Sequence, residues 1–320
     1  EAPVRGEFLC NRDEPNVCVL DWTRWRWAGE PEFHALAEVL KADRQVRDSL
    51  GLEHRGGEML QPWYAKQYDT KHYGELELEY AFEIGEMPEG TVYLAGERPE
   101  LNHYAINGVA LTSTDINDFW IDDCFKKMQI PAGALRLGRN TVTVRVSFMR
   151  TTNIEALYLV GEFGVKAQGQ ICTLTGLPKR IGCENYENYG LPFYTGCMTY
   201  RLTPEQYRGI LGDAADQAER ILLSPASFTG GCVKVSAMGR TTVLGWEPYE
   251  ADVTEAVRAG ASIDVTVVGT RRNVFGPLHQ IPKIAGACGP GNFTTEGAGW
   301  TDEYSLIDSG LTGITLRAQV

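Results

Sequence analysis

Long apolar runs, an excess of basic residues and clustered cysteines are all missing from this sequence. Over its 320 residues, no stretch approaches the roughly 18 consecutive apolar residues that a membrane-spanning helix needs. The 30 Lys and Arg residues are outnumbered by 42 Asp and Glu residues, so the formal net charge is -12. Binding to nucleic acid requires clustered positive charge. We therefore expect no membrane and no nucleic acid among the partners, whereas a neutral carbohydrate is compatible with this charge.

Sequence motifs of common catalytic sites are also missing. The chain has no Gly-x-Ser-x-Gly nucleophile elbow, no His-Glu-x-x-His metal motif, no phosphate-binding loop and no dinucleotide-binding glycine pattern. Its five histidines are dispersed. The local sequence therefore indicates no catalytic residue and no organic cofactor.

The eight cysteines are scattered along the chain, at positions 10, 18, 124, 172, 183, 197, 232 and 288. No pair has Cys-x-x-Cys or zinc-ligand spacing, and the cysteines are too sparse to build a disulfide scaffold. We interpret most of them as reduced, buried, small hydrophobic residues, which favours a cytoplasmic location. The sequence begins at Glu1 and has no visible signal peptide. We interpret it as a piece of a longer protein.

Alternating polar and apolar residues indicate β-strands over most of the chain. In the longest run, 75–84, every second side chain points to one face, as in a half-buried antiparallel strand. These apolar residues are Leu76, Leu78, Tyr80, Phe82 and Ile84. Further strands are expected at 16–21, 22–27, 91–95, 102–106, 124–130, 141–148, 198–202, 219–223, 232–237, 241–244, 263–268 and 313–318. Asn107-Gly108 is a strong signal for a hairpin turn.

Short strands at this spacing, without alternating helices, predict an all-β protein made of antiparallel β-sandwiches. Residues 63–175 and 176–320 share an order of signals, in which a strand, a one-turn helix, a glycine and a second, paired strand follow one another. We therefore predict two tandem sandwich modules with these boundaries. Residues 1–62 are expected to form a mixed connector. Helices are predicted at Glu32–Leu50, ended by Gly51, and at Pro204–Leu211.

Three segments carry a resemblance to a known family. They are Ile106-Asn-Gly-Val-Ala-Leu111, the run from Ile130-Pro to Val144, and Gly245-Trp-Glu-Pro-Tyr-Glu-Ala-Asp-Val-Thr254. In this order they resemble the galactose-binding-like, jelly-roll modules of large bacterial glycoside hydrolases related to glycoside hydrolase family 2. Segments 55–63, 190–196 and 270–279 also look like parts of such enzymes. The second module departs from the pattern, because Ala237-Met-Gly239 stands at the expected Asn-Gly turn.

The resemblance implies a jelly-roll fold and a non-catalytic accessory role, either in binding carbohydrate or in bracing the catalytic domain of the same parent chain. No catalytic residue is carried over, because the family's paired carboxylates lie on a separate barrel domain. Two other hypotheses remain open. The chain could be a self-contained sugar hydrolase, or a purely structural or protein-interaction module.

An acidic segment supplies the candidates for a catalytic pair or a metal site. It contains Asp115, Asp118, Asp122 and Asp123. Glycoside hydrolysis needs two carboxyl groups roughly 5–9 Å apart, whereas Ca²⁺ prefers several oxygen ligands. Three interpretations stay open: a solvated loop, a structural calcium site formed by Asp115, Asp118 and Asp122, and an acid–base pair.

Flat aromatic rings and planar polar side chains are the groups that hold sugars. The aromatic candidates are Trp120, Trp246, Tyr249 and Trp300, although any single Trp is more often a core residue. The Gly- and Pro-rich segment 269–300 adds four polar candidates, Arg271, Arg272, Asn273 and His279. If the last strand pairs beside 263–268, Trp246 and Trp300 would supply a stacking face near these polar residues. We predict a ligand or domain-contact surface there, with the alternative that these residues only stabilise the fold.

Overall fold

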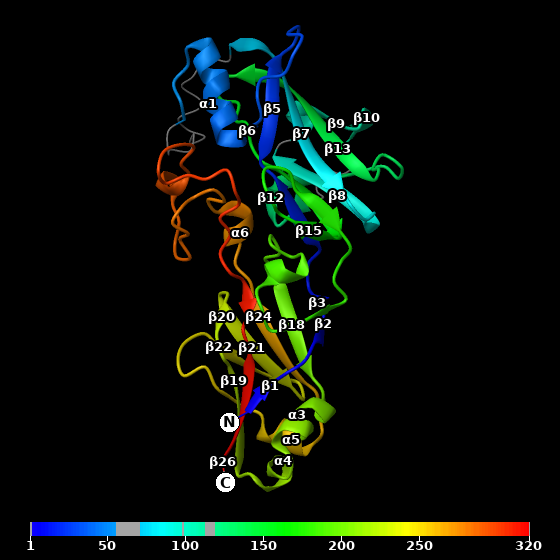
Figure 1. The fold of residues 1–320 in the computed structure, drawn as a ribbon, viewed down its shortest axis with the longest axis vertical. Coiled ribbons are helices and arrows are strands. Elements are labelled where there is room, and N and C mark those ends of the chain that lie inside the picture. Colours follow the sequence, from blue (N-terminus) through cyan, green and yellow to red (C-terminus); the bar gives the residue numbers. More distant parts are fainter. Residues whose placement is uncertain (1, 56–70, 98, 113–118, 320) are drawn as a thin grey trace. The chain divides into compact units, whose positions relative to one another are not determined.

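Antiparallel β-sheets dominate the computed structural model, which confirms the predicted all-β class. The structure describes residues 2–55, 71–97, 99–112 and 119–319. Contacts divide the chain into two compact units (Figure 1). Unit 1 consists of Glu1–Pro15, Leu177–Val274 and Ile307–Val320, and unit 2 consists of residues 16–176 and 275–306. No helix among the described residues is long and apolar enough to cross a membrane.

Unit 1 is a sandwich of two main antiparallel sheets. The larger runs in the order β22 (Arg240–Leu244), β21 (Cys232–Ala237), β24 (Ile263–Val268), β18 (Cys197–Leu202) and β3 (Asn11–Arg12). The smaller runs in the order β1 (Ala2–Val4), β26 (Ile314–Gln319), β19 (Arg220–Pro225) and β23 (Ala251–Asp252). Two short pairs complete it, β17 (Arg180–Ile181) with β2 (Phe8–Leu9) and β20 (Phe228–Thr229) with β25 (Gly310–Leu311).

The apolar faces of these sheets enclose one core. Val233 and Val265 from the larger sheet, and Leu223 and Leu316 from the smaller one, belong to the same buried cluster. The helices of unit 1 are α3 (Pro204–Leu211), α4 (Ala214–Gln217) and α5 (Thr254–Arg258), with a 3-10 turn η2 (Tyr186–Tyr189). Helix α3 confirms the prediction for this segment.

Unit 2 contains an eight-stranded and a five-stranded sheet. The first runs β10 (Val109–Leu111), β9 (Asn102–Ile106), β13 (Gly138–Met149), β7 (His72–Ile84), β16 (Thr173–Thr175) and β15 (Gly164–Lys166), and β5 (Trp22–Trp27) joins β7 to β6 (Ala37–Glu38). The second runs β11 (Phe119–Trp120), β12 (Asp122–Gln129), β8 (Glu89–Glu97), β14 (Leu157–Glu162) and β4 (Asn16–Leu20). Two 3-10 turns, η1 (Pro99–Leu101) and η3 (Pro290–Asn292), also belong to unit 2. Strand β16 pairs with β7 in parallel. A one-turn helix, α6 (Arg272–Phe275), stands where the chain passes from unit 1 to unit 2.

Two local predictions in unit 2 are confirmed. All five apolar side chains expected to share one face of β7 are buried. Asn107 and Gly108 form the turn between β9 and β10 with φ angles of 49° and 84°. This positive-φ pair gives the twist that a two-residue hairpin requires. The Asn107 amide also donates to Ala134 O and to Asn140 Oδ1, at 2.8 Å each.

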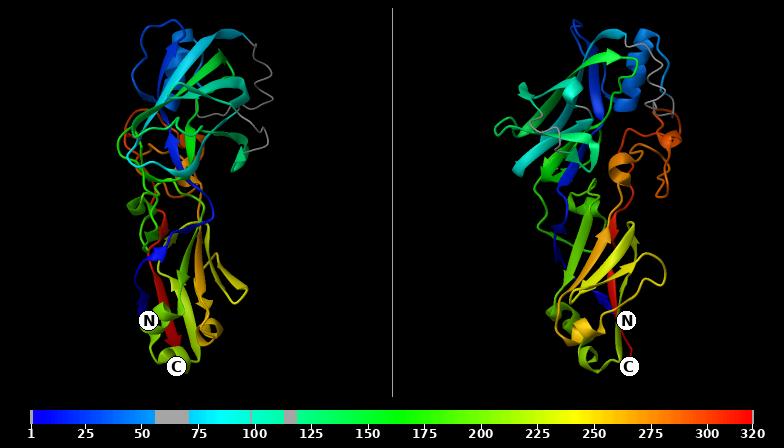
Figure 2. Two further views of the ribbon diagram at one scale, coloured as in Figure 1. Left: turned by 90° about the vertical axis from the view of Figure 1, so that its right-hand side faces the viewer. Right: turned by 180° about the vertical axis from the view of Figure 1, so that it is seen from behind.

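The predicted N-terminal helix begins later than expected. Helix α1 spans Val39–Leu50 and packs beside β5 and β6 (Figure 1; Figure 2). Ala37 and Glu38 instead pair with β5, and the Glu38 carboxylate caps the helix by accepting from the backbone N–H groups of Leu40 and Lys41. Gly51 ends the helix in the left-handed conformation, as predicted.

The predicted module boundaries differ from those of the compact units. Within the segment predicted as a connector, β4 is fully buried and pairs with β14, while β1, β2 and β3 belong to sheets of unit 1. Residues 275–306 belong to unit 2, although the prediction placed them in the second module. These pairings join segments more than 100 residues apart in sequence, so alternation along each strand could not reveal them.

Candidate functional site

The predicted ligand-binding residues are divided between the two compact units. Trp246, Tyr249 and residues 271–273 lie in unit 1, whereas Trp120, His279 and Trp300 lie in unit 2. The last strand, β26, pairs with β19 and β1, and β24 pairs with β18 and β21. The predicted pairing of the last strand beside 263–268, which was to place a stacking face of Trp246 and Trp300 near the polar candidates, is therefore absent from the described strands.

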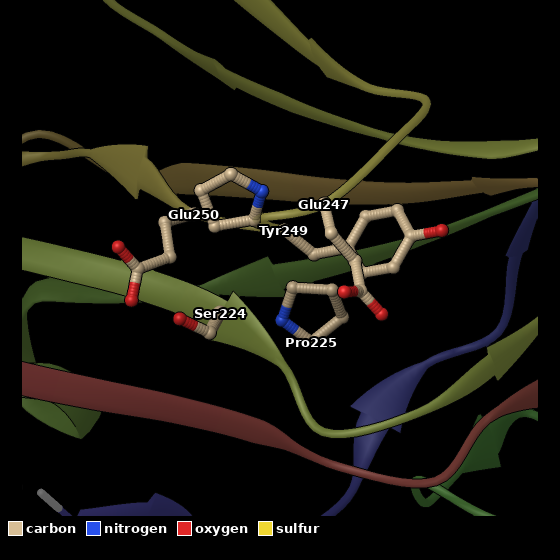
Figure 3. A pocket seen from close by; sticks show the side chains of 6 residues that line it. Ser224, Pro225, Glu247, Tyr249 and Glu250 are labelled. Atoms are coloured by element: carbon tan, nitrogen blue, oxygen red, sulfur yellow. The ribbon is translucent and has the colours of Figure 1, made fainter.

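A surface hollow of about 520 Å³ in unit 1 contains one of the predicted residues (Figure 3). We call it the Tyr249 hollow, and it is lined by Ser224, Pro225, Glu247, Pro248, Tyr249 and Glu250. Ser224 and Pro225 end β19, and the other four residues belong to the loop between β22 and β23. In the view of Figure 3 the two carboxylates flank the side chains of Ser224 and Pro225.

Packing and charge fix part of this hollow. The Tyr249 ring stands edge-on to Phe228 of β20, with 5.2 Å between ring centroids. This contact fixes the wall of the hollow that Tyr249 forms. The Glu250 carboxylate accepts a hydrogen bond from Arg317 Nη2 at 2.6 Å. Glu247 is exposed and has no ion-pair partner among the described residues.

Trp246 precedes the lining residues on the same loop, and its side chain is 79% exposed. Met238 and Val243, on the hairpin that leads to this loop, are also exposed. An indole ring presented to water has an open face for stacking. Trp246 therefore retains the property that a sugar platform requires.

The polar candidates of segment 271–273 are engaged within unit 1. Arg271 donates two hydrogen bonds of 2.6 Å to the Glu14 carboxylate and one of 2.9 Å to Thr195 Oγ1. The hydrogen bonds to Glu14 raise the pKa of Arg271 above its usual value. Arg272 and Asn273 are buried, and the Asn273 amide donates to the carbonyl oxygens of Pro192 and Ile307. The expectation that these side chains project from a loop toward a ligand is corrected, because they tie that loop to the fold.

Trp120 is a core residue. Only 7% of it is exposed, and its ring lies 5.0 Å from that of Tyr158, measured between centroids. Phe125 and Phe275 complete the aromatic cluster. The predicted role of Trp120 as a sugar platform is therefore corrected in favour of core packing, since no open face remains for a ligand.

His279 is also buried, within a cluster of charged groups in unit 2. Its Nδ1 lies 3.0 Å from Thr301 O and 3.1 Å from Glu303 O, and its Nε2 lies 3.1 Å from Asp21 Oδ2. Carbonyl and ionised carboxylate oxygens accept hydrogen bonds, so both ring nitrogens face acceptors, an arrangement that favours the protonated imidazole. Burial lowers the pKa of His279, but the hydrogen bond and charge of Asp21 outweigh it and raise that pKa above 6.5.

Two further residues complete this cluster. The Tyr304 hydroxyl donates to Asp21 Oδ1 at 2.7 Å. The buried Glu38 carboxylate caps α1, and burial together with the negative charge of Asp21 raises its pKa to about 7. Trp300 stands at the edge of the cluster, with its ring centroid 6.0 Å from that of His279. No spacing in the sequence pointed to this cluster, because Tyr304 and His279 lie more than 240 positions from Asp21 and Glu38.

Two of the four aspartates in the acidic segment, Asp115 and Asp118, lie outside the described residues. Asp122 is exposed, and a hydrogen bond from the backbone N–H of Cys124 lowers its pKa. Asp123 forms an ion pair with Lys126. Among the described residues, no group of three or more His, Cys, Asp or Glu side chains could hold a metal ion.

Ser147, His72 and Glu75 bring together the residue types of a hydrolytic triad on the exposed ends of β13 and β7. Both neighbours contact the same ring nitrogen, His72 Nε2. A triad requires the acid on one nitrogen and the nucleophile on the other. This cluster therefore has no geometry for relaying a proton.

Comparisons with known proteins give weak structural likenesses. No family model matches the chain, and no curated protein matches its sequence. A β-glucuronidase from Ruminococcus gnavus, solved with an N1-substituted uronic isofagomine, is 11% identical over 84% of this chain and 42% of its own, with a TM-score of 0.31. A glycosyl hydrolase family 2 member from Bacteroides cellulosilyticus is 8% identical over 80% of this chain and 32% of its own, with a TM-score of 0.28.

A third structure, the α-L-rhamnosidase of Streptomyces avermitilis with L-rhamnose, is 13% identical over 60% of this chain and 21% of its own, with a TM-score of 0.24. The chain spans less than half the length of each of these three proteins. TM-scores of this size do not establish a common fold.

Proposed function

We propose that this chain is a non-catalytic accessory region of a multidomain glycoside hydrolase and that it binds carbohydrate at the Tyr249 hollow. The observation that carries this proposal is the 79% exposed side chain of Trp246, on the loop that forms the hollow. Leaving a large apolar ring in water forgoes the free energy of its burial. A sugar that stacks its C–H face on the indole would recover part of that free energy.

The hollow supplies polar groups that suit hydroxyl-rich ligands. Glu247 and Glu250 carry carboxylate oxygens, which accept hydrogen bonds from sugar hydroxyls, and the Ser224 hydroxyl can donate or accept. Hydrogen bonds to charged acceptors are the stronger ones. The resemblance of the segment 245–254 to sugar-binding modules points to the same loop.

The test is binding of a panel of oligosaccharides to the purified chain, measured by calorimetry. Trp246→Ala is expected to weaken the affinity for any sugar that binds by about tenfold, which corresponds to about 1.4 kcal/mol. Met238→Ala is the matched control, because this side chain is 59% exposed at the other end of β22. Equal affinity of wild type and Trp246→Ala would overturn the assignment of this site.

A second candidate function has its own observation. Strand β22 is an edge strand of the larger sheet in unit 1, and Met238, Val243 and Trp246 expose apolar side chains along its hairpin and the following loop. Such an edge can pack against another domain. If the hollow braces the catalytic domain of the parent chain, Trp246→Ala should weaken association with that separately expressed domain and leave sugar binding unchanged.

A further inference from the structure

We infer that the Tyr249 hollow selects uncharged and amine-bearing sugars over uronic acids and other anionic sugars. This inference rests on the proposed function, because it names the ligand class of the same site. It follows from the charges that line the hollow and from the partners of those charges.

The six lining residues include two carboxylates and no Lys, Arg or His. Among the described residues, Arg317 is the cation with an ion pair to a lining residue, and its Nη2 donates to Glu250 at 2.6 Å. On the neighbouring strands, Arg220 is held by Asp252, with 3.0 Å between Nε and Oδ2. These two pairs leave the exposed carboxylate of Glu247 as the uncompensated charge of the hollow.

A sugar carboxylate in this hollow would meet that negative charge without a cation to receive it. Two like charges about 5 Å apart in water repel by about 0.8 kcal/mol, which is about a fourfold loss of affinity. An ammonium group at the same place would gain affinity by a similar factor. A hydroxyl can donate to Glu247 at no charge cost, so a neutral sugar should lie between the two.

The experiment compares three tetrasaccharides with the same β-1,4 linkage, built from glucose, glucosamine or glucuronic acid. Calorimetry at low salt and at about pH 6, where amines carry a proton, is expected to give the affinity order glucosamine, glucose, glucuronic acid, with about fourfold between steps. At about 1 M salt the Debye length falls to about 3 Å, and the three affinities should converge.

Glu247→Gln keeps the size and hydrogen-bonding capacity of the side chain and removes its charge. It is expected to abolish the discrimination among the three sugars and to weaken binding of the glucose oligomer, because an amide oxygen is a weaker acceptor than a carboxylate. Glu255→Gln is the control, since this exposed carboxylate pairs with Arg240 outside the hollow. Melting temperatures of both variants show whether they fold as the wild type does.

The outcomes separate this inference from the proposed function. If none of the three sugars binds, the proposed function is overturned and this inference with it. If sugars bind through Trp246 but the glucuronic acid oligomer binds as well as or better than the glucose oligomer, the carbohydrate site stands and the inferred ligand class is wrong. Persistence of the affinity order in Glu247→Gln also overturns the inferred ligand class.

Discussion

His279 Nε2 lies 3.1 Å from Asp21 Oδ2, although the two residues are 258 positions apart in the sequence. The contact ties the segment 275–306 to the end of β4 within unit 2. It is an ion pair in a buried setting, since each of the two side chains is only 6% exposed. Both Asp21 oxygens are engaged, one by His279 and the other by Tyr304.

The first prediction concerns this buried ion pair. Asp21→Asn removes the negative charge that compensates the protonated imidazole, so the buried ring loses either its partner or its proton. At about pH 5 we expect unit 2 to lose about 1.5–3 kcal/mol of its free energy of unfolding, measured by urea denaturation.

The chain contains a matched exposed pair as a control. His54 Nε2 lies 2.6 Å from Asp48 Oδ1, but these side chains are 41% and 65% exposed. Asp48→Asn should change the free energy of unfolding by less than about 1 kcal/mol, because water already solvates both groups. Similar losses in the two variants would contradict the assignment of His279 and Asp21 as a buried pair.

The second prediction is a loss of stability as pH rises. His279 has a folded-state pKa above 6.5, so its contribution is fully present below about pH 6.5 and is lost as pH rises through the folded value. Glu38 has a pKa of about 7 in the folded state and 4.5 in the unfolded state, so the folded state binds its proton more tightly. The stability that this provides is therefore lost as pH rises from 4.5 to about 7. Both groups act in the same direction.

We therefore expect unit 2 to unfold at a lower temperature at about pH 8 than at about pH 6. Thermal unfolding followed by near-ultraviolet circular dichroism, which senses the tryptophans of unit 2, is the measurement. His279→Gln and Glu38→Gln together should flatten the pH profile in this window. A melting temperature that rises from pH 6 to pH 8 would be the opposite of this expectation.

The third prediction compares the stability cost of an Ala substitution at two glycines with positive φ, of which only one is closely packed. Gly310 has a φ of 108°, and an added Cβ would meet Tyr186 Cε1 at 2.6 Å. Gly297 has a φ of 83°, and an added Cβ would meet nothing within 4 Å. Gly297→Ala should cost about 1 kcal/mol from the conformation alone. Gly310→Ala should cost about 1–3 kcal/mol more, because the core of unit 1 must shift.

Chemical denaturation of the two variants measures this difference. If Gly310→Ala and Gly297→Ala are equally stable, the close packing of Gly310 against Tyr186 is not present in solution. Both variants replace a glycine of positive φ by alanine. The difference between their free energies of unfolding therefore reports mainly the close contact at Gly310.

The fourth prediction follows from the proposed non-catalytic role. The isolated chain is expected to turn over no aryl glycoside, because Asp122 and Asp123 are exposed and Asp123 already pairs with Lys126. A general acid needs a setting that keeps it protonated near neutral pH, whereas the pKa of Asp122 is lowered. Release of nitrophenol from a panel of aryl glycosides is the assay. Turnover that disappears in Asp122→Asn or Asp123→Asn would establish the self-contained hydrolase instead.

Local sequence was sufficient for the elements whose cause is local. Alternation over β7 predicted its buried face, because side chains of a strand point to opposite sides in turn. Asn107-Gly108 predicted a hairpin, because both residues tolerate positive φ. Thr203 and Gln206 cap α3 reciprocally, so this short helix carries its own start signal.

Only the tertiary structure decided which distant segments meet. The strands expected at 16–21 and 22–27 had no predicted partners, and only the fold pairs β4 with β14 and β5 with β7. Helix α1 begins at Val39 rather than Glu32, because Ala37 and Glu38 form β6 and pair with β5. His279 lies in a Gly- and Pro-rich segment that is typical of a ligand-binding loop. Its ring is nevertheless buried, in contact with Asp21 and two backbone carbonyls. The periodicity of a sequence records which side of an element is apolar, whereas burial and charge pairing depend on the partner that covers that side.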